Sequence, residues 1–197
     1  MPVSPTTNYS LPTTNSPRRR IVIAGTTGSG KTTIARRLAS IVGGEHIELD
    51  ALYWEPNWQP AEIGVFRERV AKAVEAPRWV VDGGYASHVH DVAWRNADLF
   101  VWLDYHFPLV MARLLRRTFS RVRSGEELWN GNRERLRSQF MSRDSLFLWA
   151  VKAHFKYHRT YPDYFRRPEL AHVRFVRLRS PRETERLLRE IAATAQV

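Results

Sequence analysis

Residues 25–32 read Gly-Thr-Thr-Gly-Ser-Gly-Lys-Thr, a full match to the pattern G-x-x-x-x-G-K-[S/T]. Glycines let such a backbone curl until several N–H groups point inward at one anion, where a Cβ would obstruct the approach. Lys31 adds a mobile positive charge for terminal phosphates, and the Thr32 hydroxyl is an oxygen ligand suited to Mg²⁺. The pattern predicts a loop that holds the phosphates of a nucleoside triphosphate, with ATP and Mg²⁺ as the cofactors.

The residues on either side of the loop supply the context that this chemistry requires. An apolar run at 21–24 comes before it, and a helix-like stretch at 32–39 comes after it. Strand, glycine loop and helix in that order are rare by chance, and the helix adds the positive end of its dipole. The alternative is a glycine-rich turn that binds nothing. The residues predicted to contact the nucleotide are Gly25, Thr26, Thr27, Gly28, Ser29, Gly30, Lys31, Thr32 and Thr33.

Asp82 follows the apolar run at 79–81, which reads as a strand. In parallel sheets covered by helices, ligands bind beyond the carboxyl ends of the strands, so this carboxylate would lie near the phosphate loop. Thr32 and Asp82 are therefore the two predicted metal ligands, acting directly or through water. The alternative is that Asp82 only begins the turn before Gly83.

Asp50 lies 19 residues after Lys31, at the end of a short strand-like run at 46–49. A carboxylate there would face an acceptor, orient its hydroxyl and accept its proton during phosphoryl transfer. Lys31 and Asp50 are therefore predicted to be catalytic. A helix cap or turn cap is the alternative role of Asp50.

Positive charge is concentrated in one part of the chain. Residues 106–167 carry 14 basic and 5 acidic side chains, a net charge of +9 in a chain of net charge +11. Arg113 and Arg117 share a helical face and are predicted to be catalytic and to contact the nucleotide. A guanidinium on the transferred group is worth about 10³- to 10⁵-fold in rate. Further arginines, most of them expected to be solvated, are Arg116, Arg121, Arg123, Arg133, Arg135, Arg137 and Arg143. A solvated helical face and a nucleic-acid surface are the alternatives.

Short apolar runs alternate with longer amphipathic stretches along the chain. The predicted strands are 20–24, 46–49, 79–82, 99–103 and 173–178, and the predicted helices are 31–41, 61–75, 108–121, 132–157 and 181–194. This alternation indicates a three-layer α/β fold, a parallel sheet with helices on both faces. The last strand alternates more than the others, as an edge strand does.

The length and composition of the chain limit the number of domains it can form. The 197 residues suit one domain over 18–197, with an acceptor-binding region near 51–76 and a mobile lid near 118–135. Residues 1–17, rich in Pro, Ser and Thr, are predicted to be a disordered tail. There is no cysteine and no run of the roughly 18 to 20 apolar residues that a membrane span needs. We expect a cytoplasmic protein without a membrane partner.

Four further runs occur in order after the phosphate loop: 50–54 (Asp-Ala-Leu-Tyr-Trp), 79–85 (Trp-Val-Val-Asp-Gly-Gly-Tyr), 97–104 (Ala-Asp-Leu-Phe-Val-Trp-Leu-Asp) and 114–118 (Leu-Leu-Arg-Arg-Thr). Together they resemble the adenylate-kinase-related P-loop proteins often labelled DNA topology modulation proteins. The resemblance implies a P-loop NTPase sheet in the order 2-3-1-4-5 with an arginine-rich lid. It also implies that Ser180 and Pro181 lie near the adenine. That family usually has Asn where this chain has Gly84.

The chain departs from true nucleotide kinases at two places. Those enzymes place an arginine shortly after the second strand and another four residues beyond the aspartate of the third. Here the first region is acidic and aromatic, and the second position is Ala86. Arg67, Arg69 or Arg95 are the candidates to replace those arginines, although their spacing does not require it.

The acidic end of the second strand and the Gly-Gly pair are more similar to shikimate and gluconate kinases, which phosphorylate hydroxyls. The resemblance therefore implies a small-molecule acceptor presenting a hydroxyl. The residues predicted to bind it are Asp50, Tyr53, Trp54, Gly83, Gly84 and Tyr85. Core packing is the alternative role of the aromatic side chains.

These observations favour an ATP- and Mg²⁺-dependent phosphotransferase acting on a small molecule. A nucleoside triphosphate and a small-molecule acceptor are its expected partners. The alternatives are a nucleic-acid-associated ATPase, which would bind DNA or RNA with a steep salt dependence, and a nucleoside monophosphate kinase. A nucleotide-binding regulator without turnover is the third alternative, and the presence of both Asp50 and Asp82 argues against it.

Overall fold

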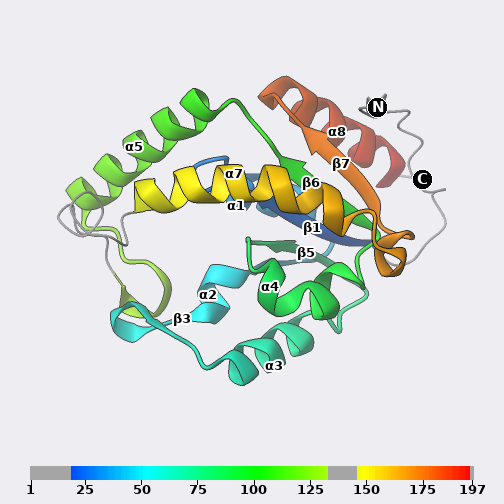
Figure 1. Ribbon diagram of the computed structural model, residues 1–197, viewed down its shortest axis with the longest axis horizontal. Helices are drawn as coiled ribbons and strands as arrows, with labels where there is room; N and C mark the ends of the chain where they lie inside the picture. Colours follow the sequence, from blue (N-terminus) through cyan, green and yellow to red (C-terminus); the bar gives the residue numbers. More distant parts are fainter. Residues whose placement is uncertain (1–18, 133–145, 196–197) are drawn as a thin grey trace.

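Five parallel strands form the centre of the molecule in the order β2-β5-β1-β6-β7 (Figure 1). The computed structural model describes residues 19–132 and 146–195. The strands are β1 (Arg19–Gly25), β2 (Glu45–Glu48), β5 (Arg78–Asp82), β6 (Leu99–Leu103) and β7 (Arg174–Leu178). Numbered among themselves these strands run 2-3-1-4-5, so the predicted fold class and strand order are confirmed.

Alternate residues of the central strand β1 face opposite layers of the molecule. Ile21 and Ile23 pack into one apolar core, and Val22 and Ala24 pack into another. Because both faces are covered, the strand reads as one continuous apolar run. Its four inner residues are at most 3% exposed. The strand ends at the phosphate loop, which is thereby held at the carboxyl edge of the sheet.

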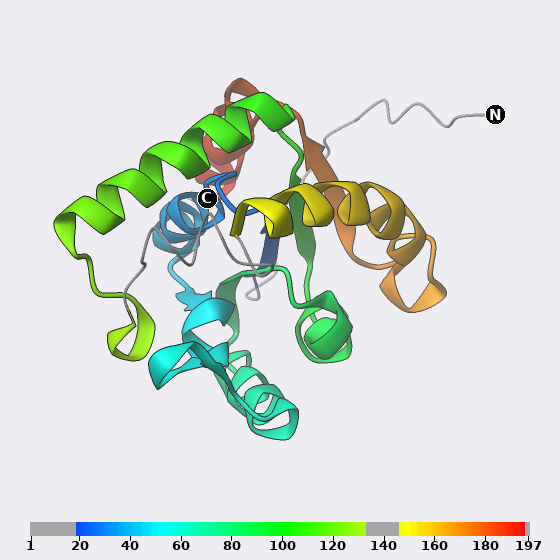
Figure 2. The same ribbon diagram turned by 60° about the vertical axis from the view of Figure 1, so that its left-hand side comes forward.

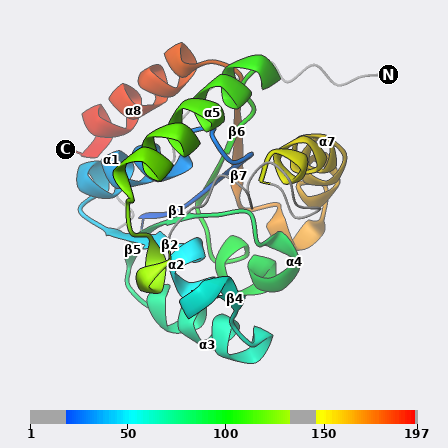
Figure 3. The same ribbon diagram turned by 90° about the vertical axis from the view of Figure 1, so that its left-hand side faces the viewer.

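The first core is closed by three helices that lie on one side of the sheet in Figure 3. They are α1 (Lys31–Val42), α5 (Phe107–Ser124) and α8 (Pro181–Ala195). The other core lies under α7 (Leu146–Tyr164), α3 (Ile63–Ala73), α4 (Ala86–Val89) and a π-helical turn, His90–Trp94. The sheet is therefore covered on both faces, as the alternating pattern predicts.

The strands in the middle of the sheet are more buried than the strand at its edge. Every residue of β6 is buried, because β6 lies between β1 and β7. In β7 only Val176 and Leu178 are buried. The alternating pattern of this last strand is that of an edge strand, and the structure places it at the edge.

The segment after β2 forms elements that the sequence did not predict. A short helix, α2 (Leu49–Tyr53), leads into a small antiparallel hairpin of β3 (Trp54–Glu55) and β4 (Gln59–Pro60). Asp50 therefore lies in the first turn of α2, two residues beyond the end of β2. Helix α2 has only five residues, so it is too short for the spacing of its apolar side chains to show a helical period in the sequence.

The long basic region differs from its prediction at one helix end. The helix predicted at 108–121 continues to Ser124, so the stretch predicted to be a lid begins as helix, and Gly125 ends α5 in a left-handed conformation. In α7, Trp149 and Phe155 are 47% and 64% exposed. Residues that do pack it are Ala150, Ala153, Tyr157 and Tyr161.

Parts of several expectations lie outside the described residues: the tail at 1–17, the lid residues 133–135, the start of the long helix before 146, and Arg133, Arg135, Arg137 and Arg143. Within residues 19–132 and 146–195, no helix combines the length and the apolar character needed to cross a membrane.

Candidate functional site

The loop at 25–32 curls over the carboxyl edge of the sheet and runs directly into α1. Gly28 has a φ of +84°, and a Cβ there would lie 2.8 Å from the carbonyl oxygen of Val110. Only glycine fits this close approach to α5. Helix α1 begins after Gly30 without a side chain capping its first turn. Its first N–H groups are therefore free of a competing side-chain acceptor and suited to an anion.

Lys31 projects back over this loop. Its Nζ lies 3.3 Å from the carbonyl oxygen of Thr26. Burial lowers the pKa of Lys31, and the nearby carboxylates of Asp50 and Asp82 act in the opposite direction. A bound polyphosphate would add negative charge beside Lys31 and so favour its charged form, against the effect of burial.

Arg113 and Arg117 reach the loop from α5, one helical turn apart. Arg117 Nη2 donates to the Thr27 hydroxyl over 3.1 Å, and Arg113 Nη1 lies 3.4 Å from the carbonyl oxygen of Ser29. Both predicted arginines are thus beside the predicted phosphate site. Arg121 instead pairs with Glu126. Arg116 and Arg123 are exposed.

Three oxygen-bearing side chains gather beside the first turn of α1. Asp82 is 2% exposed, and its Oδ2 receives no hydrogen bond from the described residues, although His46 Nε2 lies 3.5 Å away. Glu48 stands opposite Asp82 on the neighbouring strand, with its Oε1 3.4 Å from Thr32 Oγ1. A buried carboxylate oxygen of Asp82 without a hydrogen bond, together with the carboxylate of Glu48 and the hydroxyl of Thr32, is a donor set that fits Mg²⁺.

Glu48 is a residue that the sequence analysis missed. Burial raises the pKa of Glu48, and the charge of Asp82 adds to this effect. A cation bound between Glu48 and Asp82 would relieve their mutual repulsion. The signal was present in the sequence, because Glu48 and Asp50 form an acidic pair at the end of β2.

Asp50 and Tyr85 form the centre of the predicted acceptor region. The Tyr85 hydroxyl donates to Asp50 Oδ1 over 2.6 Å. Burial raises the pKa of Asp50, while the hydrogen bond from Tyr85 and the charge of Lys31 lower it. The charges of Asp50 and Lys31 each act on the pKa of the other, as expected of two groups at the same edge of the sheet.

The Gly83-Gly84 pair lets other elements approach the chain just after β5. A Cβ on Gly83 would lie 2.7 Å from the Cβ of Leu49 in α2. A Cβ on Gly84 would collide with the hydroxyl of Tyr157 from α7. Tyr157 is buried and interacts electrostatically with Asp50, and burial raises its pKa to about 12. The glycines therefore bring α2 and α7 together around Asp50.

Aromatic rings continue outward from this centre. Tyr53 contacts Tyr85 with 4.7 Å between ring centroids and Trp54 with 5.0 Å. Trp58 packs edge-on against Trp54, and Trp129 packs edge-on against Trp58. Trp129 in turn donates a side-chain hydrogen bond to Glu48. Tyr53 and Trp54 are half-buried, which is compatible with contact to an acceptor.

The segment from Gly125 to Asn132 docks on the β3–β4 hairpin, and the two lie side by side in Figures 1 and 2. Asn132 is 3% exposed, accepts from the Trp58 N–H over 2.8 Å and donates to the carbonyl of Glu55 over 2.9 Å. Asn130 donates to the carbonyl of Trp54. The described part of the predicted lid is thus joined to the predicted acceptor region.

Ser180 and Pro181 begin α8, just beyond the carboxyl end of β7. The Ser180 hydroxyl accepts from the Glu183 N–H over 3.2 Å, and Glu183 accepts from the Arg179 N–H over 2.7 Å. These two hydrogen bonds cap the start of α8 in the manner of a capping box, with the return bond made one residue before Ser180. The structure thus places Ser180 and Pro181 at the same edge of the sheet as the phosphate loop, where the adenine is predicted to lie.

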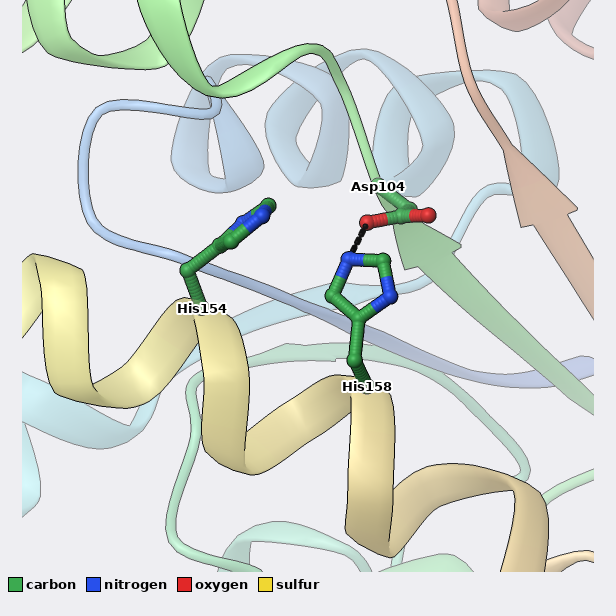
Figure 4. A group of neighbouring side chains, drawn as sticks. All are labelled: Asp104, His154 and His158. Carbon is green, nitrogen blue, oxygen red and sulfur yellow. Dashed lines mark ion pairs between the residues drawn. The ribbon is translucent and has the colours of Figure 1, made fainter.

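Asp104 lies beyond β6 and joins three elements (Figure 4). Its Oδ1 is 2.8 Å from His158 Nε2 on α7, and its Oδ2 is 2.7 Å from Arg177 Nε on β7. Ligand atoms of Asp104, His154 and His158 lie within 4.8 Å of one another, a spacing that a metal ion could use. The i, i+4 spacing of the two histidines was its sequence signal.

The hydrogen bonds of this cluster favour a structural role over a metal site. Arg177 Nη2 lies 3.3 Å from His158 Nδ1, so Nδ1 is the acceptor and the Nε2–H faces Asp104. A metal at Nε2 would require the other tautomer, with its Nδ1–H against the guanidinium. Asp104 therefore forms structural ion pairs with His158 and Arg177.

Comparisons with known proteins bear on this geometry. The search of family models finds no match. A tRNA dimethylallyltransferase of Chlamydia trachomatis serovar L2 is 37% identical over 95 residues, 48% of this chain and 24% of that protein. A putative adenylate kinase of Pyrococcus abyssi is 35% identical over 114 residues, 55% of this chain and 61% of that protein. The chain thus spans about a quarter of the first relative and less than two thirds of the second.

Solved structures match over more of the chain. A sugar kinase from Janibacter sp. has a TM-score of 0.53 at 20% identity and covers 90% of this chain and 98% of its own. Shikimate kinase from Bacteroides thetaiotaomicron has a TM-score of 0.53 at 17% identity and covers 91% and 99%. The chain has the fold of the P-loop kinases. Both the adenylate-kinase-like and the shikimate-kinase-like expectations are supported at this level, and the comparisons give no support to the DNA topology modulation label.

Proposed function

We propose that the protein is an ATP- and Mg²⁺-dependent phosphotransferase that acts on a hydroxyl of a small molecule. The observation that carries the proposal is the geometry of the phosphate loop, which Lys31, Arg113 and Arg117 all reach, with the Asp50 carboxylate held by Tyr85 at the same edge of the sheet. The kinase neighbours in fold and the putative adenylate kinases in sequence support the same reaction class. Binding alone would not need Asp50 at this place.

In this proposal the loop amides, Lys31 and the two arginines of α5 bind the triphosphate. Thr32, Glu48 and Asp82 would hold Mg²⁺, which supplies neutralisation of the phosphate oxygens. Asp50 accepts the hydroxyl proton as the acceptor oxygen bonds to the γ-phosphorus and the bond to the β,γ-bridging oxygen breaks. Tyr85 holds the Asp50 carboxylate in place through its hydrogen bond. Positioning and electrostatics of this kind account for most of the catalysis in phosphoryl transfer.

The test is ADP formation from Mg·ATP across a library of hydroxyl-bearing metabolites. Lys31→Ala should abolish acceptor-dependent ADP formation, and Asp50→Asn should lower it about 10²- to 10⁴-fold while leaving ATP binding measurable by calorimetry. Exposed Arg123→Ala is the matched control and should keep full activity. Full activity in Lys31→Ala contradicts the proposal.

A second candidate is a nucleic-acid acceptor or partner. It is motivated by the +9 charge of residues 106–167 and by the match to a tRNA-modifying enzyme. It predicts RNA or DNA binding that weakens steeply between two salt concentrations in a gel-shift titration. Absence of binding at low salt eliminates this candidate.

A further inference from the structure

We infer that the acceptor carries no phosphate or carboxylate group and is an uncharged or amino-bearing hydroxyl compound. The inference rests on the proposed function and narrows its substrate class. It comes from three arginines, at 67, 69 and 95, that are the candidates to anchor an anionic acceptor in place of the arginines of nucleotide kinases. The structure shows how each is used.

The guanidinium group of Arg67 is already paired with the carboxylate of Asp91. Its Nη1 and Nη2 donate to Asp91 Oδ1 and Oδ2 over 2.9 Å and 2.6 Å. The same Nη1 also donates to the carbonyl of His88. The guanidinium holds the pKa of Asp91 at about 2, so Asp91 stays ionised at neutral pH. A bidentate pair of this kind occupies the donors that an acceptor carboxylate or phosphate would need.

Arg69 is bound to the segment that carries the aromatic rings. Its Nη1 lies 2.7 Å from Glu55 Oε1 and donates to the carbonyl of Leu52 over 3.1 Å. Glu55 belongs to β3, directly after Trp54. The positive charge of Arg69 is therefore neutralised within the hairpin.

Arg95 lies at the wrong end of the sheet. It follows the π-helical turn and precedes β6, so it lies near the amino ends of the strands. Its carbonyl accepts from the side chain of His172, which precedes β7. Lys31 and Asp50 lie at the opposite, carboxyl edge, so Arg95 has no access to an acceptor there.

The remaining side chains of the acceptor region repel anions and suit cations. Asp50 contributes a carboxylate, while Tyr53 and Trp54 contribute ring faces and edges. An anionic acceptor would meet like charge without a free guanidinium on this side, as far as the described residues show. An ammonium group or a neutral ring would be attracted by the Asp50 carboxylate and the rings. The cations at the loop, Lys31 and the arginines of α5, contact residues of the phosphate loop and are assigned to the triphosphate by the proposed function.

The experiment compares matched acceptors under saturating Mg·ATP: an amino sugar, the corresponding neutral sugar, the corresponding sugar acid and a nucleoside monophosphate. We expect kcat/KM for the amino or neutral sugar to exceed that for both anionic compounds by about tenfold or more. Equal or faster transfer to an anionic compound overturns the inference and leaves the proposed kinase standing. Acceptor-independent ADP formation with all four, unchanged in Lys31→Ala, overturns the kinase itself.

A variant of Asp91 tests whether the Arg67–Asp91 pair is the reason that anionic acceptors are excluded. Asp91→Asn should release the Arg67 fork and raise the ratio of acid to neutral-sugar transfer by about threefold or more, since a charged hydrogen bond becomes available. Asp163→Asn is the control, because Asp163, at the end of α7, forms an exposed pair with Arg166 just beyond the helix. The same ratio in wild type and both variants overturns the assignment of anion exclusion to this pair.

Discussion

At the scale of single residues, the hydrogen bond from Tyr85 to Asp50 affects the pH range in which the predicted base is deprotonated. Asp50 must be deprotonated to accept the acceptor proton, so activity is lost as the pH falls through the pKa of Asp50. Burial raises this pKa above the ordinary value of aspartate, and the Tyr85 hydrogen bond opposes that rise. The acid limb of kcat/KM therefore depends on burial and on this hydrogen bond, and a variant that removes the hydrogen bond should shift it.

We expect Tyr85→Phe to move that acid limb to higher pH, because the variant removes a hydrogen bond that stabilises the ionised carboxylate. The measurement is the pH profile of kcat/KM from about pH 4 to about pH 8, a range that begins near the ordinary pKa of aspartate and extends above it. Tyr53→Phe is the control, since Tyr53 contacts the same ring but gives no hydrogen bond to Asp50. A limb that moves to lower pH, or stays in place, contradicts this role of Tyr85.

At the scale of elements, the turn after β5 and helix α7 are fitted to each other through Gly84 and Tyr157. Gly84→Ala should destabilise the fold by about 1–3 kcal/mol, because the new methyl group collides with the Tyr157 hydroxyl in a buried site. Tyr157→Phe removes that hydroxyl and leaves the ring carbon at 3.4 Å as the nearest atom. The double variant should therefore be more stable than Gly84→Ala alone.

Urea unfolding of the wild type, both single variants and the double variant measures this coupling. Tyr157→Phe alone gives the cost of losing the hydroxyl, which is subtracted in the cycle. Equal stability of Gly84→Ala and the double variant would mean that the turn relaxes by moving the backbone instead. The same cycle tests whether contact with Tyr157 is the reason that glycine stands where the resembled family has Asn.

The elements also show what could be predicted from sequence. The five strands, the phosphate loop and the capping box at Ser180 were predictable because each is a local pattern. The docking of Asn132 on Trp58 was not, because its partners lie 74 residues apart and neither belongs to a periodic element. Glu48 was overlooked although its strand was predicted, because its role depends on register with Asp82.

At the scale of the whole molecule, the edge strand β7 is held to the sheet by an ion pair as well as by backbone hydrogen bonds. Asp104 is close to Arg177 because Leu103 and Leu178 are register partners on β6 and β7. Arg177 also lies over the ring of Trp102, 4.4 Å from its centroid, and Trp102 packs against His158. Strand β7, strand β6 and α7 are thereby linked at the edge where the nucleotide is predicted to lie.

Asp104→Asn should lower the free energy of unfolding by about 1–3 kcal/mol, because it leaves Arg177 and His158 without their shared, 6%-exposed carboxylate. For a chain of this size each kcal/mol corresponds to about 2–4 °C in Tm, which calorimetry resolves. Asp163→Asn removes an exposed pair, with side chains 72–75% exposed, and should leave Tm nearly unchanged. Equal Tm values for Asp104→Asn and wild type would show that the link between the sheet edge and α7 is apolar, through Trp102 and Tyr161, and that the charges only accompany it.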